Sequence, residues 1–318
     1  MHQFFVRRWF LLALGAAIAL GFLFPGALSE FTDQIRTEPI VAVVLFVMML
    51  PLEITAMGRA FRRPGPVALA VAVNYGLLPP FAWLVSRALP AHMSDIAIGL
   101  VVMASIPCTL ASAAVWTRRA GGNDAVAILV TLITNGACFL VTPAWLLLLT
   151  GTKTEIDFGL LVGRLALIVV LPMVIAQLFR LRLPVARWAT ANKIPLGVLA
   201  QCGILIIVLI GATRAGVQLS STENGSLGLL GTVLLFVMTV GVHVSMLWLG
   251  HFLSRRLRMD RADRIAVGFA SSQKTMMVGL YVCLTYYDHV PLAILPMVVY
   301  HVGQLLIDTL VADRLRMG

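Results

Sequence analysis

Charged residues are scarce in this chain. Only 12% of its 318 residues are Asp, Glu, Lys or Arg, whereas 60% are hydrophobic, and the mean hydropathy is +0.95. A soluble domain of this length could not bury so much apolar surface, which excludes the soluble globular class. The apolar runs are about 20 residues long, which suits a membrane-spanning helix and is about twice the length of a barrel strand. We therefore expect an all-α integral membrane protein.

Cysteines and metal-binding motifs are sparse too. The four cysteines lie in apolar segments without a CxxC pair, so we interpret them as buried side chains and not as disulfides or metal ligands. No HExxH zinc motif is present, and we expect no cofactor. We also expect the protein not to be an enzyme. Ser271 or Ser272 near Lys274 superficially resembles a Ser-Lys dyad, which leaves an intramembrane hydrolase as an alternative.

Acidic residues are few, 14 against 24 basic ones, which gives a net charge of +10. Most basic residues cluster in alternate short connectors between the apolar runs, which follows the positive-inside rule and argues against nucleic acid as a partner. We therefore predict cytoplasmic termini, an even number of spans and a location in the cell (inner) membrane. The lipid bilayer is then the expected partner, and the sequence leaves the oligomeric state open.

Ten apolar segments are predicted to cross the membrane as helices. They are residues 10–24, 40–57, 67–89, 96–116, 125–149, 158–178, 194–211, 227–253, 265–287 and 292–311. The first could instead belong to a signal peptide, with Ala27-Leu28-Ser29 as its cleavage site. Residues 183–193 have an amphipathic pattern and are predicted to lie at the membrane interface.

Polar residues interrupt the fourth and the ninth span. The fourth contains Pro107, which lacks a backbone donor, and the ninth contains Ser271 to Thr275 with Lys274 near mid-membrane. A charged side chain there costs about 2.5–3.5 kcal/mol on insertion scales and usually marks a transport pathway. Interrupted segments at corresponding positions in two halves point to a transporter binding site. We therefore predict two inverted five-helix repeats, residues 1–150 and 151–318.

Four motifs carry a resemblance to a known family. They are Pro107-Cys108-Thr109-Leu110-Ala111-Ser112, Gly121-Gly122-Asn123-Asp124, Ser272-Gln273-Lys274-Thr275 and Tyr300-His301-Val302-Gly303-Gln304. Together they resemble the bile acid:sodium symporter superfamily, and its SBF-like branch in particular. The resemblance implies a panel domain (spans one, two, six and seven) and a core domain (spans three to five and eight to ten), with the broken fourth and ninth helices crossing in the core. It also implies a secondary active transporter of a small organic anion that works by alternating access.

The resemblance also implies where ions and substrate bind. Sodium-coupled members hold two cations near the crossover; Ser112 and Thr131 match the first cation site, and Asn74 and Gln273 match the second. The full set of candidate binding residues is Asn74, Thr109, Ser112, Thr131, Ser271, Ser272, Gln273, Lys274, Thr275, His301 and Gln304.

The chain departs from the family pattern at four positions in or near these two cation sites. Ala113 and Ala127 replace an asparagine and a serine of the first site, Phe269 replaces the acidic ligand, and Lys274 replaces an asparagine. Because sodium prefers oxygen ligands and the ammonium repels it, these departures argue against ordinary two-sodium coupling. The ammonium is predicted to stand in for a bound cation, by neutralising carbonyl ends or contacting an anionic substrate. A lysine that releases a proton would instead couple transport to H⁺, so Na⁺ and H⁺ both stay open.

The remaining polar residues of the spans have simpler interpretations. We predict structural roles for His243 and Asn135, and hydration or pairing with loop arginines for Glu53 and Asp308 near the span ends. A channel, or a membrane regulator of ion homeostasis that does not transport, is the alternative to a carrier.

Overall fold

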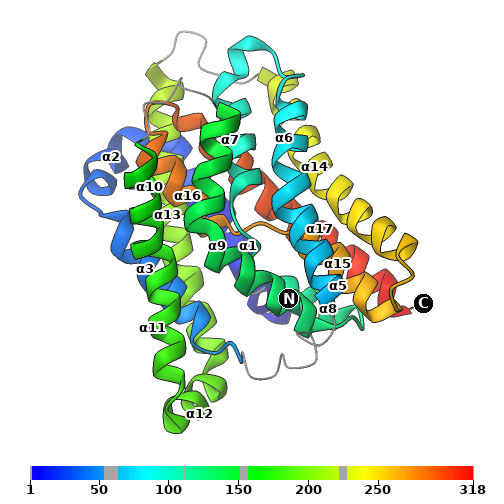
Figure 1. Ribbon diagram of the computed structural model, residues 1–318. Helices are drawn as coiled ribbons and strands as arrows, with labels where there is room; N and C mark the ends of the chain where they lie inside the picture. Colours follow the sequence, from blue (N-terminus) through cyan, green and yellow to red (C-terminus); the bar gives the residue numbers. More distant parts are fainter. Residues whose placement is uncertain (1, 54–63, 111, 151–156, 222–227, 318) are drawn as a thin grey trace.

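A computed structural model describes residues 2–53, 64–110, 112–150, 157–221 and 228–317 of the chain, and these residues form helices joined by short connections, without a strand (Figure 1). The first half contains α1 (His2–Leu23), α2 (Pro25–Asp33), α3 (Thr37–Met49), α5 (Pro64–Val71), α6 (Leu78–Ser86), α7 (Ser94–Ser105), α8 (Ser112–Arg119) and α9 (Asp124–Thr150). The second half contains α10 (Phe158–Leu165), α11 (Leu171–Arg180), α12 (Leu183–Ala191), α13 (Lys193–Ser221), α14 (Gly228–Arg256), α15 (Arg261–Ser272), α16 (Met276–Tyr286) and α17 (Ile294–Met317). The all-helical prediction is confirmed for the described residues.

Six helical segments in the described residues are long and apolar enough to cross a membrane. They are residues 64–86, 124–150, 158–180, 193–220, 228–256 and 291–316, which coincide with the third, fifth, sixth, seventh, eighth and tenth predicted spans. The first predicted span passes the same test only as a bent pair, because α1 turns by 105° into α2. The second is represented by the shorter α3, and its end lies outside the described residues. The count of ten spans therefore stays a prediction.

The third and the sixth predicted span each contain one turn of π-helix. These turns are Ala72–Leu77, between α5 and α6, and Ala166–Val170, between α10 and α11. A proline follows each turn, Pro79 in the first case and Pro172 in the second. Proline cannot donate the next helical hydrogen bond, so the register widens locally and leaves backbone carbonyls free for other donors. The first π turn contains Asn74, which lies in the candidate site.

Both predicted interruptions are present. The fourth predicted span separates into α7 and α8, with extended backbone beginning at Ile106, and the ninth separates into α15 and α16 at Gln273–Thr275. The two breaks contact each other directly: the backbone amide of Thr275 donates to the carbonyl oxygen of Pro107 at 2.9 Å. The half-helices on either side also pack together, α8 against α15 and α7 against α16.

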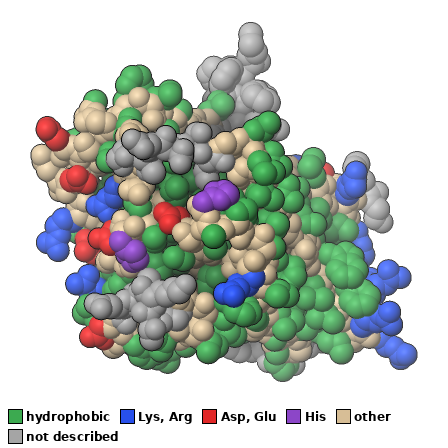
Figure 2. Space-filling view, turned by 90° about the horizontal axis from the view of Figure 1, so that it is seen from above, with side chains coloured by type: hydrophobic (Ala, Val, Ile, Leu, Met, Phe, Trp, Pro, Cys, Tyr) green, Lys and Arg blue, Asp and Glu red, His purple; other side chains and the backbone are tan. Residues whose placement is uncertain are grey.

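Large hydrophobic side chains lie on the outside of the bundle. Leu148, Leu230 and Trp248 are among the exposed ones, and Figure 2 shows hydrophobic side chains spread broadly over one face of the molecule. Residues 183–191, predicted to be amphipathic, form α12 with Leu183 and Trp188 exposed. An exterior of this kind suits contact with lipid chains.

Candidate functional site

The ammonium group of Lys274 lies in a cage of carbonyl oxygens. Its Nζ donates to the backbone oxygen of Asn74 at 2.8 Å, to Asn74 Oδ1 at 2.9 Å and to the backbone oxygen of Ile106 at 2.8 Å. The ring of Tyr75 lies 5.2 Å away, within cation–π range. Lys274 is 1% exposed, and no carboxylate in the described residues lies within ion-pair distance of it. Three hydrogen bonds use all the donors of the ammonium, so dipoles balance this buried charge.

Asn74 caps the end of the half-helix α15. Its Nδ2 donates to the carbonyl oxygens of Ala270, Ser271 and Gln273, at 2.9, 3.3 and 3.0 Å. These oxygens lie at the C-terminal end of α15, where intrahelical partners are lacking and the helix dipole is negative. Ile106, which accepts from Lys274, occupies the corresponding position at the end of α7. The C-terminal ends of α7 and α15 therefore converge on one amide and one ammonium.

Gln304 of α17 pairs with the backbone of the ninth-span break. Its Oε1 accepts from the amide of Lys274 at 3.0 Å and its Nε2 donates to the carbonyl oxygen of Lys274 at 3.1 Å. The same Nε2 lies 3.0 Å from Nδ1 of His301. The His301 ring meets the ring of Phe10 on α1 edge to face, so it lies where α17 approaches α1.

A second chain of polar contacts leads from the fourth-span break to a buried acid. Ser112 Oγ donates to Gln273 Oε1 at 2.7 Å, and Gln273 Nε2 donates to Oδ2 of Asp308. Oδ1 of Asp308 lies 2.9 Å from Nε2 of His243 on α14, and both side chains are fully buried. The prediction that Asp308 is hydrated or paired with a loop arginine was therefore wrong, because α14 covers this turn of α17 and supplies the partner. Glu53, in contrast, lies 3.3 Å from Arg180, as predicted.

Asp308 was not among the predicted site residues, although its spacing in the sequence indicated that it could belong to the site. Asp308 lies four residues after Gln304, on the same face of α17, and that face also carries His301. Burial of this face is decided by the packing of α14 against α17. Phe269, which stands where the family has its acid, is 1% exposed and packs with Ala120, Ile265 and Ala312.

Helix α9 holds the backbone of the fourth-span break. Thr131 Oγ1 donates to the carbonyl oxygen of Thr109 at 3.0 Å, and Asn135 Nδ2 donates to that of Cys108 at 2.7 Å. The amide of Cys108 donates in turn to Thr134 Oγ1 at 3.2 Å. Thr131 thus contacts Thr109, another of the predicted binding residues, but in the described residues no hydrogen bond joins it to Ser112, with which it was predicted to share a cation site.

The hydroxyl groups of the ninth span have mostly local contacts. Ser272 Oγ donates to the carbonyl oxygens of Gly268 and Phe269 one turn earlier, and its own carbonyl accepts from the hydroxyl of Tyr300. Ser271 Oγ is buried against the backbone at Gly250. Within the described contacts, Lys274 Nζ bonds to carbonyl oxygens and to neither serine hydroxyl, so the geometry of a Ser-Lys dyad is not formed.

Nearly the whole chain matches one family of membrane proteins. The profile of the SBF-like CPA transporter family matches residues 8–317. The chain belongs to this family. Two broken spans that touch at a buried polar network are thus part of a membrane transporter fold, and the chain is a multi-pass membrane protein.

Individual relatives agree with the family assignment. The chain is 24% identical to sodium/bile acid cotransporter 7 of Rattus norvegicus over 321 aligned positions, which cover 98% of this chain and 93% of the rat protein. It is 23% identical to the protein of the same name from Danio rerio, with 98% and 94% coverage. An uncharacterized protein of Pseudomonas aeruginosa is 26% identical over 77% of this chain and 74% of its own length. The resemblance read from the motifs is confirmed.

Proposed function

We propose that this protein is a secondary active transporter of a small organic anion that works by alternating access. The observation that carries the proposal is the contact between the two breaks, made by Thr275 and Pro107 and surrounded by buried polar side chains. Broken helices present dipole ends to a ligand in the interior of a membrane protein, where no water competes. The C-terminal ends of α7 and α15 are already occupied by Asn74 and Lys274, whereas α8 and α16 begin near the same point with positive dipole ends. The positive dipole ends of α8 and α16 therefore favour an anion.

The proposed architecture is ten spans in two inverted five-helix repeats, residues 1–150 and 151–318, arranged as a panel and a core. The helix contacts support this division. Helices α1, α3, α11 and α13, which belong to the predicted panel spans, pack on one another, and α5, α8, α9, α14, α15 and α17 pack on one another. Figure 1 places most of these two groups on opposite sides of the molecule. Alternating access then consists of one group moving against the other, with both termini in the cytoplasm and the protein in the inner membrane.

Coupling is proposed to differ from that of two-sodium members. In its ammonium form, Lys274 provides one covalently attached positive charge in the oxygen cage where an exchangeable cation would otherwise bind. The coupling ion, Na⁺ or H⁺, is assigned to the chain of Ser112, Gln273, Asp308 and His243. This chain contains oxygen ligands for sodium and a buried carboxylate–imidazole pair that can hold a proton. Thr131 and Asn74, the other two expected sodium ligands, are engaged with backbone groups instead.

A thermal-shift screen of the purified protein against small carboxylates and sulfonates tests the function. A ligand that binds the native state raises the unfolding temperature by mass action. The compounds that raise the unfolding temperature are therefore the candidate substrates. A ligand found in this way should show saturable counterflow in proteoliposomes. Currents in planar bilayers far above carrier turnover, without counterflow, would instead establish a channel.

The coupling assignment is tested by repeating the thermal-shift measurement at several pH values and Na⁺ concentrations with an Asp308→Asn variant. The dependence of substrate binding on either Na⁺ or H⁺ should be lost in Asp308→Asn and retained in Asp288→Asn, a matched change at an exposed connector. A dependence that survives Asp308→Asn unchanged would remove Asp308 from coupling.

A further inference from the structure

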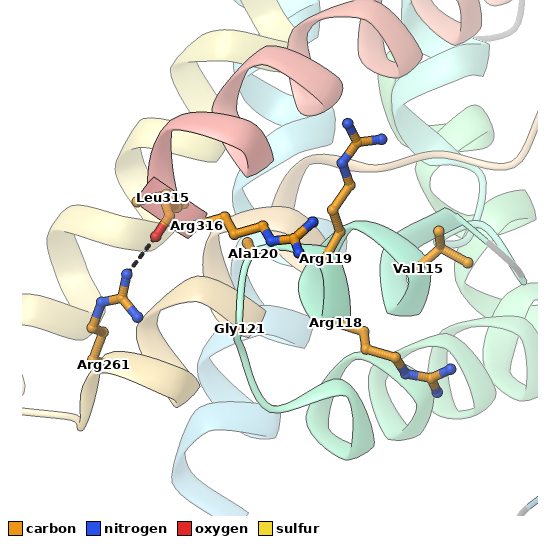
Figure 3. Close-up of a pocket in the computed structure, with 8 residues that line it drawn as sticks. All are labelled: Val115, Arg118, Arg119, Ala120, Gly121, Arg261, Leu315 and Arg316. Carbon is orange, nitrogen blue, oxygen red and sulfur yellow. Dashed lines mark hydrogen bonds between the residues drawn. The ribbon is translucent and has the colours of Figure 1, made fainter. Parts of the chain in front are cut away.

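A pocket of about 510 Å³ opens where the ends of α8, α15 and α17 meet, away from the polar network at the breaks. Figure 3 shows its lining, which contains four arginine side chains and a few apolar ones. The lining residues are Val115, Arg118, Arg119, Ala120, Gly121, Arg261, Leu315 and Arg316. The volume is in the range of small-ligand sites, about 300–1,000 Å³.

Two of the four arginines are neutralised by acids. Arg119 bonds both oxygens of Asp313, at 2.7 and 2.8 Å, and Arg118 Nε donates to Asp124 at 2.7 Å. These ion pairs link α8 to α17 and to α9. They leave no net charge of their own at the pocket.

The other two arginines keep their positive charge. Arg261 Nη2 donates to the backbone oxygen of Leu315, which is a dipole and not an anion. Arg316 is exposed, and within the described residues its guanidinium has neither an ion pair nor a hydrogen bond. Both groups border the same pocket (Figure 3), so the pocket has two positive charges that no acidic group in the described residues balances.

The turn after α8 forms part of the lining of the pocket. Gly121 has a φ of +75°, a conformation that residues with a side chain rarely adopt. A Cβ at this position would lie 3.9 Å from Nη1 of Arg261. A glycine here therefore allows the turn after α8, which lies beside the Arg261 guanidinium.

We infer that this pocket binds a phosphate group, and that the source is the headgroup of an anionic phospholipid. Guanidinium groups match phosphate oxygens in charge and geometry. Basic pockets between membrane helices on the cytoplasmic side are typical sites for such headgroups. Val115, at the rim, is 54% exposed and offers an apolar contact for the start of an acyl chain. The inference does not depend on transport, since it concerns arginines outside the crossover.

Titration of the purified full-length chain with short-chain phosphatidylglycerol, followed by thermal unfolding, tests the site. The ligand should raise the unfolding temperature of the wild-type protein, whereas phosphatidylcholine of the same chain length should not. Arg261→Gln/Arg316→Gln should weaken the apparent affinity about tenfold, because two charge-assisted contacts are lost. The matched control is Arg255→Gln/Arg314→Gln, which removes two exposed arginines that do not line the pocket and should behave like the wild type.

A third titration, with inorganic phosphate, identifies the source of the phosphate group. Competition by inorganic phosphate at concentrations similar to those of phosphatidylglycerol would support the phosphate site and identify a free phosphate as its ligand. Competition only at much higher concentrations would support the lipid headgroup. Equal effects of phosphatidylcholine and phosphatidylglycerol, or equal affinities of the wild type and Arg261→Gln/Arg316→Gln, would overturn the inference.

Discussion

Lys274 shows, at the scale of single residues, how a membrane interior can hold a charge without a counter-charge. The carbonyl of Ile106 is available because α7 ends there, and the carbonyl of Asn74 is available because of the π turn. An ammonium transferred to such a place without partners would cost several kcal/mol, and short hydrogen bonds to the freed carbonyls offset that cost. The irregular backbone and the lysine therefore stabilise each other.

Replacing Lys274 by methionine should destabilise the protein, by about 2–5 kcal/mol, because three buried carbonyl oxygens lose their donor at once. Thermal or denaturant unfolding in detergent measures the change. Lys193→Met, at an exposed position at the start of α13, is the control and should alter stability by no more than about 0.5 kcal/mol. Equal stability of Lys274→Met and wild type would mean that the cage does not depend on the ammonium.

Packing of α1 against α13 is the feature that matters at the scale of elements. Gly21 lets the two helices approach closely: a Cβ there would lie 2.6 Å from Cβ of Ala212 and 2.7 Å from the backbone of Ala212 and Thr213. A Cβ at Gly216, on α13, would likewise lie too close to the backbone oxygen of Gly21. Small residues at a membrane helix interface allow such contact, which here joins the first and seventh predicted spans.

Gly21→Ala should therefore weaken this contact and lower stability by about 1–3 kcal/mol, since backbone atoms cannot move aside as a side chain can. Gly15→Ala lies on the same helix with open space at the new Cβ, and it should be neutral or slightly stabilising. The unfolding midpoints of the two variants, measured under the same conditions, show whether Gly21→Ala lowers stability more than Gly15→Ala. Two variants of equal stability would argue against the close α1–α13 contact.

At the scale of the whole molecule, the basic residues in the sequence and their arrangement in the fold indicate the same orientation in the membrane. Arg118 and Arg119 follow the fourth predicted span, and Arg316 follows the tenth, yet all three line one pocket. These basic segments, which the positive-inside rule assigns to the cytoplasm, thus lie side by side.

A reporter fusion tests the orientation. Alkaline phosphatase, which is active only outside the cytoplasm, should be inactive when fused after residue 318 and active when fused at Pro90, in the connection between α6 and α7. A fluorescent protein that matures only in the cytoplasm should give the opposite pattern. Activity of the phosphatase at the C-terminus would reverse the topology proposed above.

The sequence predicted the helical class and the positions of both breaks because each has a local cause: hydrophobic length for the spans, and Pro107 and the polar run at Gln273 for the breaks. It also predicted several members of the polar network, through family motifs. It did not predict that Asp308 meets His243 and Gln273, because a charge near a span end is usually hydrated and only the packing of α14 on α17 excludes water here. The bend between α1 and α2 was not predicted either, although Pro25, which lacks a backbone donor, begins α2; α13 packs on both helices.

The tethering of the Lys274 ammonium also bears on the energy available to the transporter. An ion that binds in a cage and dissociates on the far side carries its charge through the membrane potential, which is worth about 2.3 kcal/mol per charge for each 100 mV. A covalently attached ammonium in that cage carries no charge across. For a monovalent anion moved together with one proton or sodium ion, the cycle is then electroneutral, and uptake responds to the ion gradient and not to voltage.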